Sequence, residues 1–297
     1  MKKISTIIIS IALVLCLMFG SVVSYSATTY YVYGSYTYSV VDKNQLAFCD
    51  WDNSSDTLTI PDGIVDDYFV MVADYALQNN SVVKTVDLSH AQHLTKIGTG
   101  AFTGCSALET LIIPSWTNEL SDYMCQDCTG LINVIIDAEI DKINVQMFNR
   151  CSSLEEFVIP SSVTTIEKFA FGNCTSLKKV VIPDSVVDIN STAFKNDEQL
   201  IIYCNTDSYA QMYAQNSNIP YILLDGPKSG DANGDGMVDI LDSTEIQKYA
   251  AESTKFTPEQ FELCDINKDG YCDVIDALLV QKYVVGEYDI PPIIYNS

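Results

Sequence analysis

A 23-residue repeat runs through the middle of the chain and limits the folds that it can adopt. Four cysteines stand at this interval: Cys105, Cys128, Cys151 and Cys174. Five leucines keep the same step: Leu108, Leu131, Leu154, Leu177 and Leu200. A unit this short cannot bury its own apolar face, so neighbouring units must stack and share one continuous core. The repeat therefore predicts a solenoid.

Two more columns complete the unit. Phenylalanine recurs at Phe102, Phe148, Phe171 and Phe194, with Cys125 in its place in the second unit. An aliphatic column contains Ile97, Leu120, Ile143, Ile166 and Ile189. Short β-branched segments such as LETLIIP and LKKVVIP each predict one strand of a parallel sheet. The expected fold is a solenoid with a stacked parallel sheet of short strands and an irregular or short-helical convex side.

The unit pattern AF-x2-C-x2-L-x5-IP resembles the leucine-rich repeats of the BspA-like bacterial surface-protein class. The resemblance covers residues 76–224. Residues 28–75 are rich in Tyr and Thr, and we expect them to form a β cap that closes the first end. Near the other end Asp197 replaces a column cysteine, and residues 201–224 are similar to the capping segment of such arrays.

A second repeat lies at the end of the chain, where GDANGDGMVDILDSTEIQKYA at 230–250 returns 34 residues later as CDINKDGYCDVIDALLVQKYV. Calcium takes about six to eight oxygen ligands, and a loop supplies them from positions 1, 3, 5, 9 and 12 and a carbonyl at position 7. The first loop offers Asp231, Asn233, Asp235, the carbonyl of Met237, Asp239 and Asp242. The second offers Asp265, Asn267, Asp269, the carbonyl of Tyr271, Asp273 and Asp276.

Both loops have glycine, Gly236 and Gly270, at position 6, where the sharp turn favours a residue without Cβ. A solvated acidic turn would not place every oxygen donor in both copies, so we expect two calcium ions. Position 12 is Asp rather than Glu, and the linker 225–229 leaves no room for a helix before the first loop. A helix is expected after each loop, and a linking helix between them begins with the capping-box residues Thr257 and Gln260.

These features resemble a type I dockerin, here residues 230–297, which is a small all-α module with two EF-hand-like calcium loops. The resemblance implies a partner, the cohesin module of a scaffoldin, in the plant-polysaccharide-degrading complexes called cellulosomes. It places recognition at positions 10, 11, 17 and 18, which are Ile240, Leu241, Gln247, Lys248, Val274, Ile275, Gln281 and Lys282. Well-known members have Ser-Thr at the first pair, so the aliphatic pairs here leave the cohesin class open. An alternative is that some of them, position 10 especially, pack inside the module.

The first 27 residues have the layout of a secretory signal peptide, with two lysines, an apolar run and small residues. The apolar run at residues 7–19 is shorter than the ~20 residues of a spanning helix, so cleavage after Ser24, Ser26 or Ala27 is favoured over a permanent anchor. No membrane span is then expected in the secreted chain. A net charge of −23 repels phosphate backbones and disfavours nucleic acid as a partner.

The sequence contains only weak indications of a catalytic site. Cys125 and Cys128 form a CxxC pair, which is typical of redox or zinc sites. Both belong to the repeat columns, and no second pair completes four zinc ligands, so buried thiols are favoured. The two histidines, His90 and His93, have no nucleophile motif near them. We therefore expect no enzyme activity.

The predicted sheet has an outward-facing apolar column flanked by polar residues: Ile112, Ile135, Val158 and Val181, beside Thr110, Asn133, Glu156 and Lys179. If this face is open, it is a binding surface for an unknown protein or carbohydrate ligand. The alternative is that a neighbouring segment covers it.

Three functions compete. The favoured one is a secreted, non-catalytic cellulosome subunit, extracellular or held at the cell surface through a scaffoldin. The second is a glycoside hydrolase-associated enzyme subunit, which is disfavoured because the expected segments account for the whole chain. The third is a calcium-stabilised adhesin without a cohesin partner.

Overall fold

The computed structural model describes residues 30–33, 35–42, 45–60 and 69–295. The expected signal peptide, residues 1–27, lies outside these ranges. The chain divides into two compact units, Met1–Leu200 and Ile201–Ser297. Among the described residues, no helix is long and apolar enough to cross a membrane.

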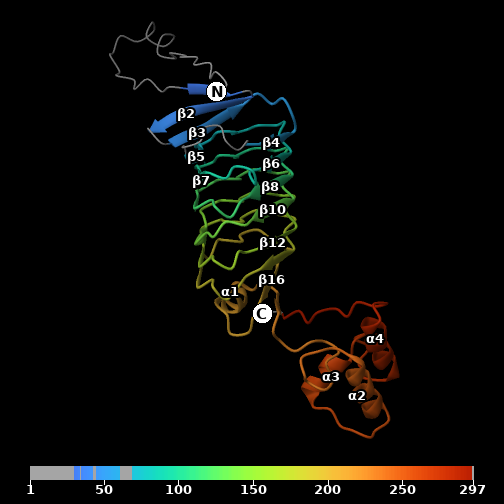
Figure 1. The fold of residues 1–297 in the computed structure, drawn as a ribbon. Coiled ribbons are helices and arrows are strands. Elements are labelled where there is room, and N and C mark those ends of the chain that lie inside the picture. The colour runs from blue at the N-terminus through green and yellow to red at the C-terminus, as the bar shows by residue number, and fades with distance from the viewer. Residues whose placement is uncertain (1–29, 34, 43–44, 61–68, 296–297) are drawn as a thin grey trace. The chain divides into compact units, whose positions relative to one another are not determined.

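The first unit begins with three antiparallel strands (Figure 1). They are β1 (Tyr30–Tyr33), β2 (Tyr36–Asp42) and β3 (Gln45–Trp51). Tyr38 and Phe48 are fully buried here, with ring centroids 5.8 Å apart. β3 then pairs in parallel with β5 (Phe69–Val72), so antiparallel pairing changes to parallel stacking at this strand. Parallel stacking therefore begins before residue 76, where we expected the repeats to start.

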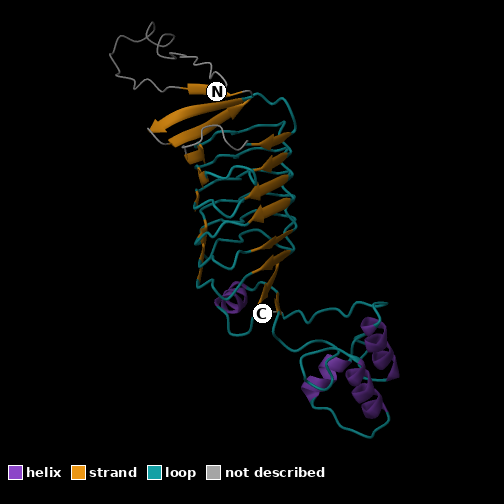
Figure 2. Cartoon of the chain, viewed as in Figure 1, coloured by secondary structure: helices purple, strands orange, loops and turns teal. Residues whose placement is uncertain are grey.

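Two columns of short strands build the rest of the first unit, one on each side of the core (Figure 2). The first strand column contains β4 (Thr57–Thr59), β6 (Thr85–Asp87), β8 (Thr110–Ile113), β10 (Asn133–Ile136), β12 (Glu156–Val158) and β14 (Lys179–Val181). The second strand column contains β5, β7 (Leu94–Ile97), β9 (Glu119–Leu120), β11 (Lys142–Ile143), β13 (Thr165–Ile166) and β15 (Asp188–Ile189). Residues one repeat apart pair in parallel, as Val134 does with Leu111. The predicted parallel solenoid is confirmed, with one repeat per rung.

The second strand column differs from the irregular or short-helical side that we expected. Its members from β9 onward have only two residues each. In a 23-residue rung that already holds a strand and two turns, few residues are left for this side. Helices shorter than ~12 residues are marginal by themselves, so a short extended segment paired with the next rung forms instead.

The repeat columns form the core. Leu108, Leu131, Leu154 and Leu177 are fully buried. The rings of Phe148, Phe171 and Phe194 stack from rung to rung at 5.4 and 5.3 Å. Each column cysteine is buried and its thiol donates a hydrogen bond to a carbonyl of an earlier rung, as Cys128 does to Phe102 at 3.0 Å. Cysteine therefore fills space and also satisfies a backbone acceptor in the core.

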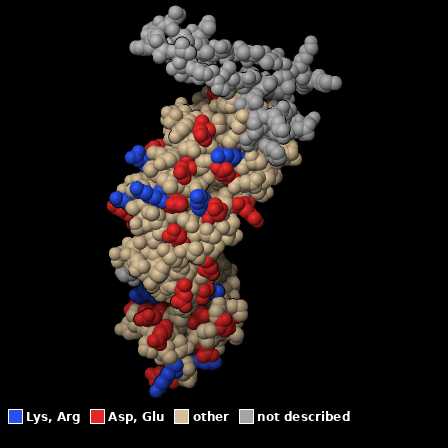
Figure 3. Space-filling model, turned by 90° about the vertical axis from the view of Figure 1, so that its left-hand side faces the viewer, with Lys and Arg blue, Asp and Glu red and all other residues tan. Residues whose placement is uncertain are grey.

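Charged side chains pair between rungs on the surface of the solenoid. Figure 3 shows Lys and Arg interspersed with Asp and Glu rather than separated from them. The ion pairs include Lys84–Glu109, Lys96–Glu119, Arg150–Asp127 and Lys178–Glu155, at 2.6–3.4 Å. Exposed pairs contribute only about 0–1 kcal/mol each, so the apolar columns decide the stability of the array.

The second unit begins with β16 (Ile201–Cys204), α1 (Tyr209–Ser217) and β17 (Tyr221–Leu223). β16 and β17 are parallel, and the longer connection between them has room for a helix. The C-terminal segment returns to β17, where Tyr295 and Tyr221 exchange two backbone hydrogen bonds of 2.8 and 3.0 Å. Their rings stack at 5.3 Å, and burial raises the pKa of Tyr295.

Three helices complete the second unit: α2 (Ile240–Ala250), α3 (Pro258–Cys264) and α4 (Val274–Val284). The predicted capping box of α3, between Thr257 and Gln260, is confirmed. A small core includes Ile246 from α2, Cys264 from α3 and Val280 from α4. The helical module that the sequence predicts is therefore present.

Candidate functional site

Each acidic loop folds around the carboxylate at its first position. Asp231 is 4% exposed and accepts backbone N–H groups from Gly234 at 2.8 Å, Asp235 at 3.2 Å and Gly236 at 2.9 Å. Gly234 and Gly236 have φ values of 77° and 85°, in the left-handed region that glycine adopts without strain. The backbone therefore wraps closely around the first carboxylate, as it does in calcium loops.

Position 12 of the first loop, Asp242, is fully buried and joins the loop to helix α2. One oxygen accepts the backbone N–H of Ala232 at 2.9 Å and of Asn233 at 3.1 Å. The other accepts the N–H of Asp239 at 2.8 Å, and Asp239 caps α2 in return. Asp242 thus serves as the N3 residue of a capping box and also holds the start of the loop. The short Asp side chain fits this double role, which accounts for its presence where an ordinary EF-hand has Glu.

The second loop repeats these contacts almost bond for bond. Its first carboxylate, Asp265, accepts the N–H of Asp269 at 3.1 Å and of Gly270 at 3.0 Å. Its last carboxylate, Asp276, is fully buried and accepts N–H groups from Ile266, Asn267 and Asp273 at 2.9–3.3 Å. The main difference lies at position 4, where Lys268 has a φ of 58° in place of Gly234.

The donor set of both loops fits a hard divalent cation such as calcium. The carboxylates at positions 1 and 12 are buried, and among the described residues none has an ion pair with Lys or Arg. Burial raises the pKa of Asp242 and the charge of Asp231 adds to this, while backbone N–H groups of Asp239 and Asn233 oppose it. A bound cation would offset that accumulated negative charge.

The loop oxygens are not drawn together into a finished cation site. No three His, Cys, Asp or Glu side chains in the described part of the chain form a group that could hold a metal ion. The amide of Asn233 donates to Asp235 at 3.1 Å, and Asn267 donates to Asp269 at 2.9 Å. Binding an ion would therefore require these amides to turn so that oxygen replaces nitrogen, while the carbonyls of Met237 and Tyr271 complete the set.

The residues expected to contact a cohesin lie on α2 and α4, and most of them face solvent. The four aliphatic side chains are about half exposed or more, at 53% for Ile240, 57% for Leu241, 61% for Val274 and 49% for Ile275. They do not pack inside the module, so that alternative is wrong. Gln247, Lys248 and Lys282 are exposed, whereas Gln281 is half-buried.

The two expected recognition surfaces are similar but not identical. Gln281 donates to the hydroxyl of Ser243 at 2.9 Å, and Ser243 donates to the carbonyl of Ala277 at 3.0 Å. Lys248 pairs with Glu245 at 2.6 Å, one turn away on the exposed face of α2. The equivalent of Glu245 in the second copy is Leu279, so this ion pair cannot form there.

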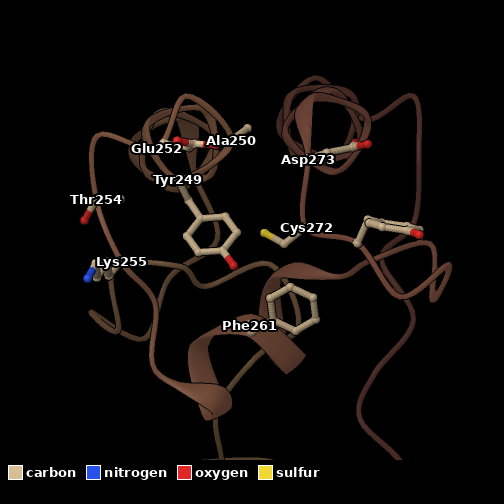
Figure 4. A pocket seen from close by; sticks show the side chains of 9 residues that line it. Tyr249, Ala250, Glu252, Thr254, Lys255, Phe261, Cys272 and Asp273 are labelled. Carbon is tan, nitrogen blue, oxygen red and sulfur yellow. The ribbon is translucent and has the colours of Figure 1, made fainter.

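A hollow of about 550 Å³ opens between the end of α2, helix α3 and the second loop (Figure 4). The rings of Tyr249 and Phe261 pack edge-to-face in its wall, with centroids 6.2 Å apart, and Cys272 lies beside them. The ring of Tyr249 also stacks on Phe256 at 4.4 Å. Cys272 is only 5% exposed, and of the two carboxylates in the lining, Glu252 and Asp273, the second caps helix α4.

The outward apolar column of the solenoid is open among the described residues. Ile135 is 47% exposed and Val158 is 67% exposed, while Ile112 and Val181 are half-buried. The flanking residues Asn133 and Glu156 are exposed as well. This face is therefore available to a ligand, and the prediction that it lies outside is confirmed.

Two features of the array were not predicted from the sequence. Asp197, in the cysteine column, is 9% exposed, and neither carboxylate oxygen meets the geometry of a hydrogen bond. Burial raises its pKa to about 7, although the backbone N–H of Cys174 partly opposes this. The other is a column of aromatic side chains in the turns. The place of Asp197 in the cysteine column follows from the repeat, but its raised pKa depends on burial, which the sequence does not show. The turn positions from Gly100 to Phe169 follow the 23-residue period, so extending the repeat alignment to every position would have found them.

Comparison with known proteins agrees with this architecture. Residues 70–201 match the BspA type leucine rich repeat region in six copies. A leucine-rich repeat protein of T. pallidum has a TM-score of 0.52 and 24% identity over 57% of this chain and 78% of its own. One from Eubacterium ventriosum has a TM-score of 0.51 and 24% identity over 65% of this chain and 47% of its own. These two likenesses support the solenoid fold alone. No curated protein matches the chain.

Residues 229–285 match the dockerin type I domain. The chain therefore contains a BspA-type leucine-rich repeat region followed by a type I dockerin. Both modules are non-catalytic, and their combination is that of an extracellular, cellulosome-type protein.

Proposed function

We propose that this chain is a secreted, non-catalytic cellulosome subunit that a scaffoldin cohesin holds through the dockerin in a calcium-dependent way. Two calcium ions fold the acidic loops and orient α2 and α4. The leucine-rich repeats then present a binding surface for a protein or a carbohydrate in the degradation of plant polysaccharides.

One observation carries this proposal. The two loops make matching hydrogen bonds to buried carboxylates at positions 1 and 12, and each loop leads directly into a helix with an exposed aliphatic pair at its start. Because position 9 is also the N-cap and position 12 the N3 residue, an ion bound in the loop would act on the same residues that begin the helix. Calcium binding and presentation of the partner surface are thereby linked.

Two other functions are weaker. A hydrolase-associated enzyme would need a free acid and base pair, whereas one of the two carboxylates that line the hollow beside the second loop, Asp273, already caps α4. A calcium-stabilised adhesin without a cohesin partner would not need exposed aliphatic pairs in equivalent positions of both copies, because calcium folding alone places no demand on those side chains.

The test is a titration of the full chain against a panel of immobilised cohesins, with calcium and with EDTA. We expect capture by at least one cohesin in calcium, and none in EDTA or after Asp231→Ala combined with Asp265→Ala. The matched control is Glu287→Ala, an exposed acidic residue of the same module outside both loops, which should bind like the wild type. Failure of every cohesin to capture a folded, calcium-loaded chain would contradict the proposal, as would hydrolysis of cellulose, xylan or pectin.

A further inference from the structure

One position in the turns of the solenoid is unusual in its backbone and its side chains. It is the third residue after β5, β7, β9, β11 and β13 of the second strand column, and we call it the turn column: Tyr75, Gly100, Tyr123, Gln146 and Phe169. All five have left-handed φ values, from 53° to 60°. The backbone N–H groups of the first four donate hydrogen bonds to backbone carbonyls of the next rung at 2.9–3.0 Å, so the turns stack in register.

Aromatic residues are costly at this position. A bulky side chain in the left-handed region costs about 1–2 kcal/mol, and glycine avoids this cost. The same turns contain a second left-handed position, which has the usual small or polar residues: Asn79, Gly104, Asp127, Arg150, Asn173 and Asn196. The aromatic residues are therefore not a general requirement of the turn. Strain of this kind often marks a functional position.

The aromatic residues occupy every second rung. Tyr75, Tyr123 and Phe169 alternate with Gly100 and Gln146. Gly100 gives its neighbour room, because a Cβ at this position would lie 2.5 Å from the Tyr75 ring. Rungs are ~4.8 Å apart, as neighbouring strands are, so successive rings are separated by about 10 Å along the array.

The rings are accessible and have donors beside them. Tyr75 is 50% exposed, and Tyr123 and Phe169 are half-buried. The ammonium groups of Lys168 and Lys195 lie 5.6 and 5.9 Å from the centre of the Phe169 ring. The turn column therefore offers the aromatic rings of Tyr75 and Tyr123 and, over the ring of Phe169, two ammonium groups that can donate hydrogen bonds to a ligand.

This spacing discriminates between ligand classes. In an extended peptide, side chains on one face recur every ~6.6–6.8 Å, which does not match rings about 10 Å apart. An extended β-1,4-linked glycan turns over at each sugar, so the same face recurs with every disaccharide, close to the two-rung spacing. The apolar C–H face of a pyranose is also suited to stack on an aromatic ring. The net charge of −23 disfavours acidic glycans.

We propose that the turn column binds a neutral, extended β-1,4-linked glycan by stacking alternate sugars on Tyr75, Tyr123 and Phe169. This inference rests on the proposed function in one respect, since it names a ligand class for the leucine-rich repeats and places it at the turn column. It does not depend on the dockerin or on calcium.

The test uses the full chain in calcium and isothermal titration with two hexasaccharides, cellohexaose and the α-1,4-linked maltohexaose. Cellohexaose should bind and maltohexaose should not, because the α-linked chain coils and does not present flat faces at this interval. The key variant is Tyr123→Gly, which removes the central ring and also relieves the left-handed strain, so it should fold at least as well as the wild type. We expect about tenfold weaker binding of cellohexaose, as for the loss of one aromatic contact. Tyr123→Phe keeps the ring and should bind normally.

Three results would overturn the inference: no binding of cellohexaose by the wild type, equal binding of the two glycans, or unchanged affinity in Tyr123→Gly. Cohesin capture by the same variants should match the wild type. Loss of glycan binding with intact cohesin capture therefore tests the turn column, whereas loss of capture alone bears on the dockerin.

Discussion

The solenoid and the dockerin both repeat a short unit, but opposite chemistry holds them together. In the solenoid each repeat adds fully buried apolar side chains, such as Leu154 and Phe171, to a shared core. In residues 228–297, 14 Asp plus Glu face only 5 Lys, and the buried carboxylates Asp242 and Asp276 organise the fold. Repetition of apolar positions gives stability without a ligand, whereas we expect repetition of acidic positions to make folding depend on a bound cation.

Removal of calcium has the largest expected effect, and it should act on only one of the two regions. Removing calcium should unfold the dockerin and leave the solenoid intact. An ion present at about 100 times its Kd stabilises a fold by ~2.7 kcal/mol, so two ions supply roughly 5 kcal/mol, comparable with the total stability of a small domain. Far-UV circular dichroism of the full chain in calcium and in excess EDTA should show loss of helical signal only. An unchanged helical signal in EDTA would contradict this comparison.

The second effect concerns the apolar side of the comparison. Leu154 is fully buried in the middle of its column, so Leu154→Ala should leave a cavity and cost about 2–5 kcal/mol. The next residue is a matched control, because the side chain of Glu155 is 61% exposed and pairs only with Lys178 at 3.0 Å. Glu155→Ala should cost less than about 1 kcal/mol. Denaturant midpoints in the reverse order would show that the strand register is wrong by one residue.

The third effect concerns Asp197, a carboxylate that is buried among the apolar side chains of the solenoid core. Burial raises the pKa of Asp197 from 3.8 to about 7, so the folded state binds more protons than the unfolded state between these values. The contribution of Asp197 to solenoid stability should therefore be greatest below pH 4 and fall as pH rises towards 7, by up to about 1.4 kcal/mol per pH unit.

Asp197→Asn should remove this slope and stabilise the solenoid at pH 8 by roughly 1–3 kcal/mol. Asp197→Cys, which restores the residue of the cysteine column, should do the same. Thermal denaturation from pH 4 to 8 with calcium held constant measures the effect. The assignment would be refuted if the wild type and Asp197→Asn showed the same dependence of stability on pH.

The smallest expected effect is the change in cohesin affinity when one of the two halves of the dockerin is disabled. If either copy can dock a cohesin, disabling one removes half the binding modes and costs RT ln 2, about 0.4 kcal/mol or a twofold change in affinity. The variants are Leu241→Asp with Lys248→Glu, Ile275→Asp with Lys282→Glu, and all four together, each checked for calcium-dependent folding. Loss of binding only in the quadruple variant supports dual docking.

A collapse of affinity in one double variant alone would instead identify a single docking copy with contacts worth about 2 kcal/mol or more. The structure indicates where such a preference would arise. Lys248 is held by Glu245 in the first copy, and Gln281 is held by Ser243 in the second. Glu245→Leu, which copies the second half into the first, should reduce any difference between the two.

Sequence patterns predict features that recur with a period, and they miss those that do not. The Leu154 column and the capping box of Thr257 follow from spacing and are present as expected. The two-residue strands of the second strand column are too short to show an alternation. The bridge from Tyr221 to Tyr295 joins residues far apart in the chain, so no local pattern indicates it. The raised pKa of Asp197 depends on burial, which only the packed array shows.

The alternation in the turn column has a consequence for how such an array can change in length. Aromatic rings stand on every second rung, at Tyr75, Tyr123 and Phe169. Duplication of a single 23-residue unit would lengthen the core without disturbing it, but it would place two rings on adjacent rungs or leave two rungs without one. Duplication of a pair of units would preserve the alternation. Recombination can therefore add any number of rungs without disturbing the fold. It keeps the spacing of the aromatic rings only when the number of added rungs is even.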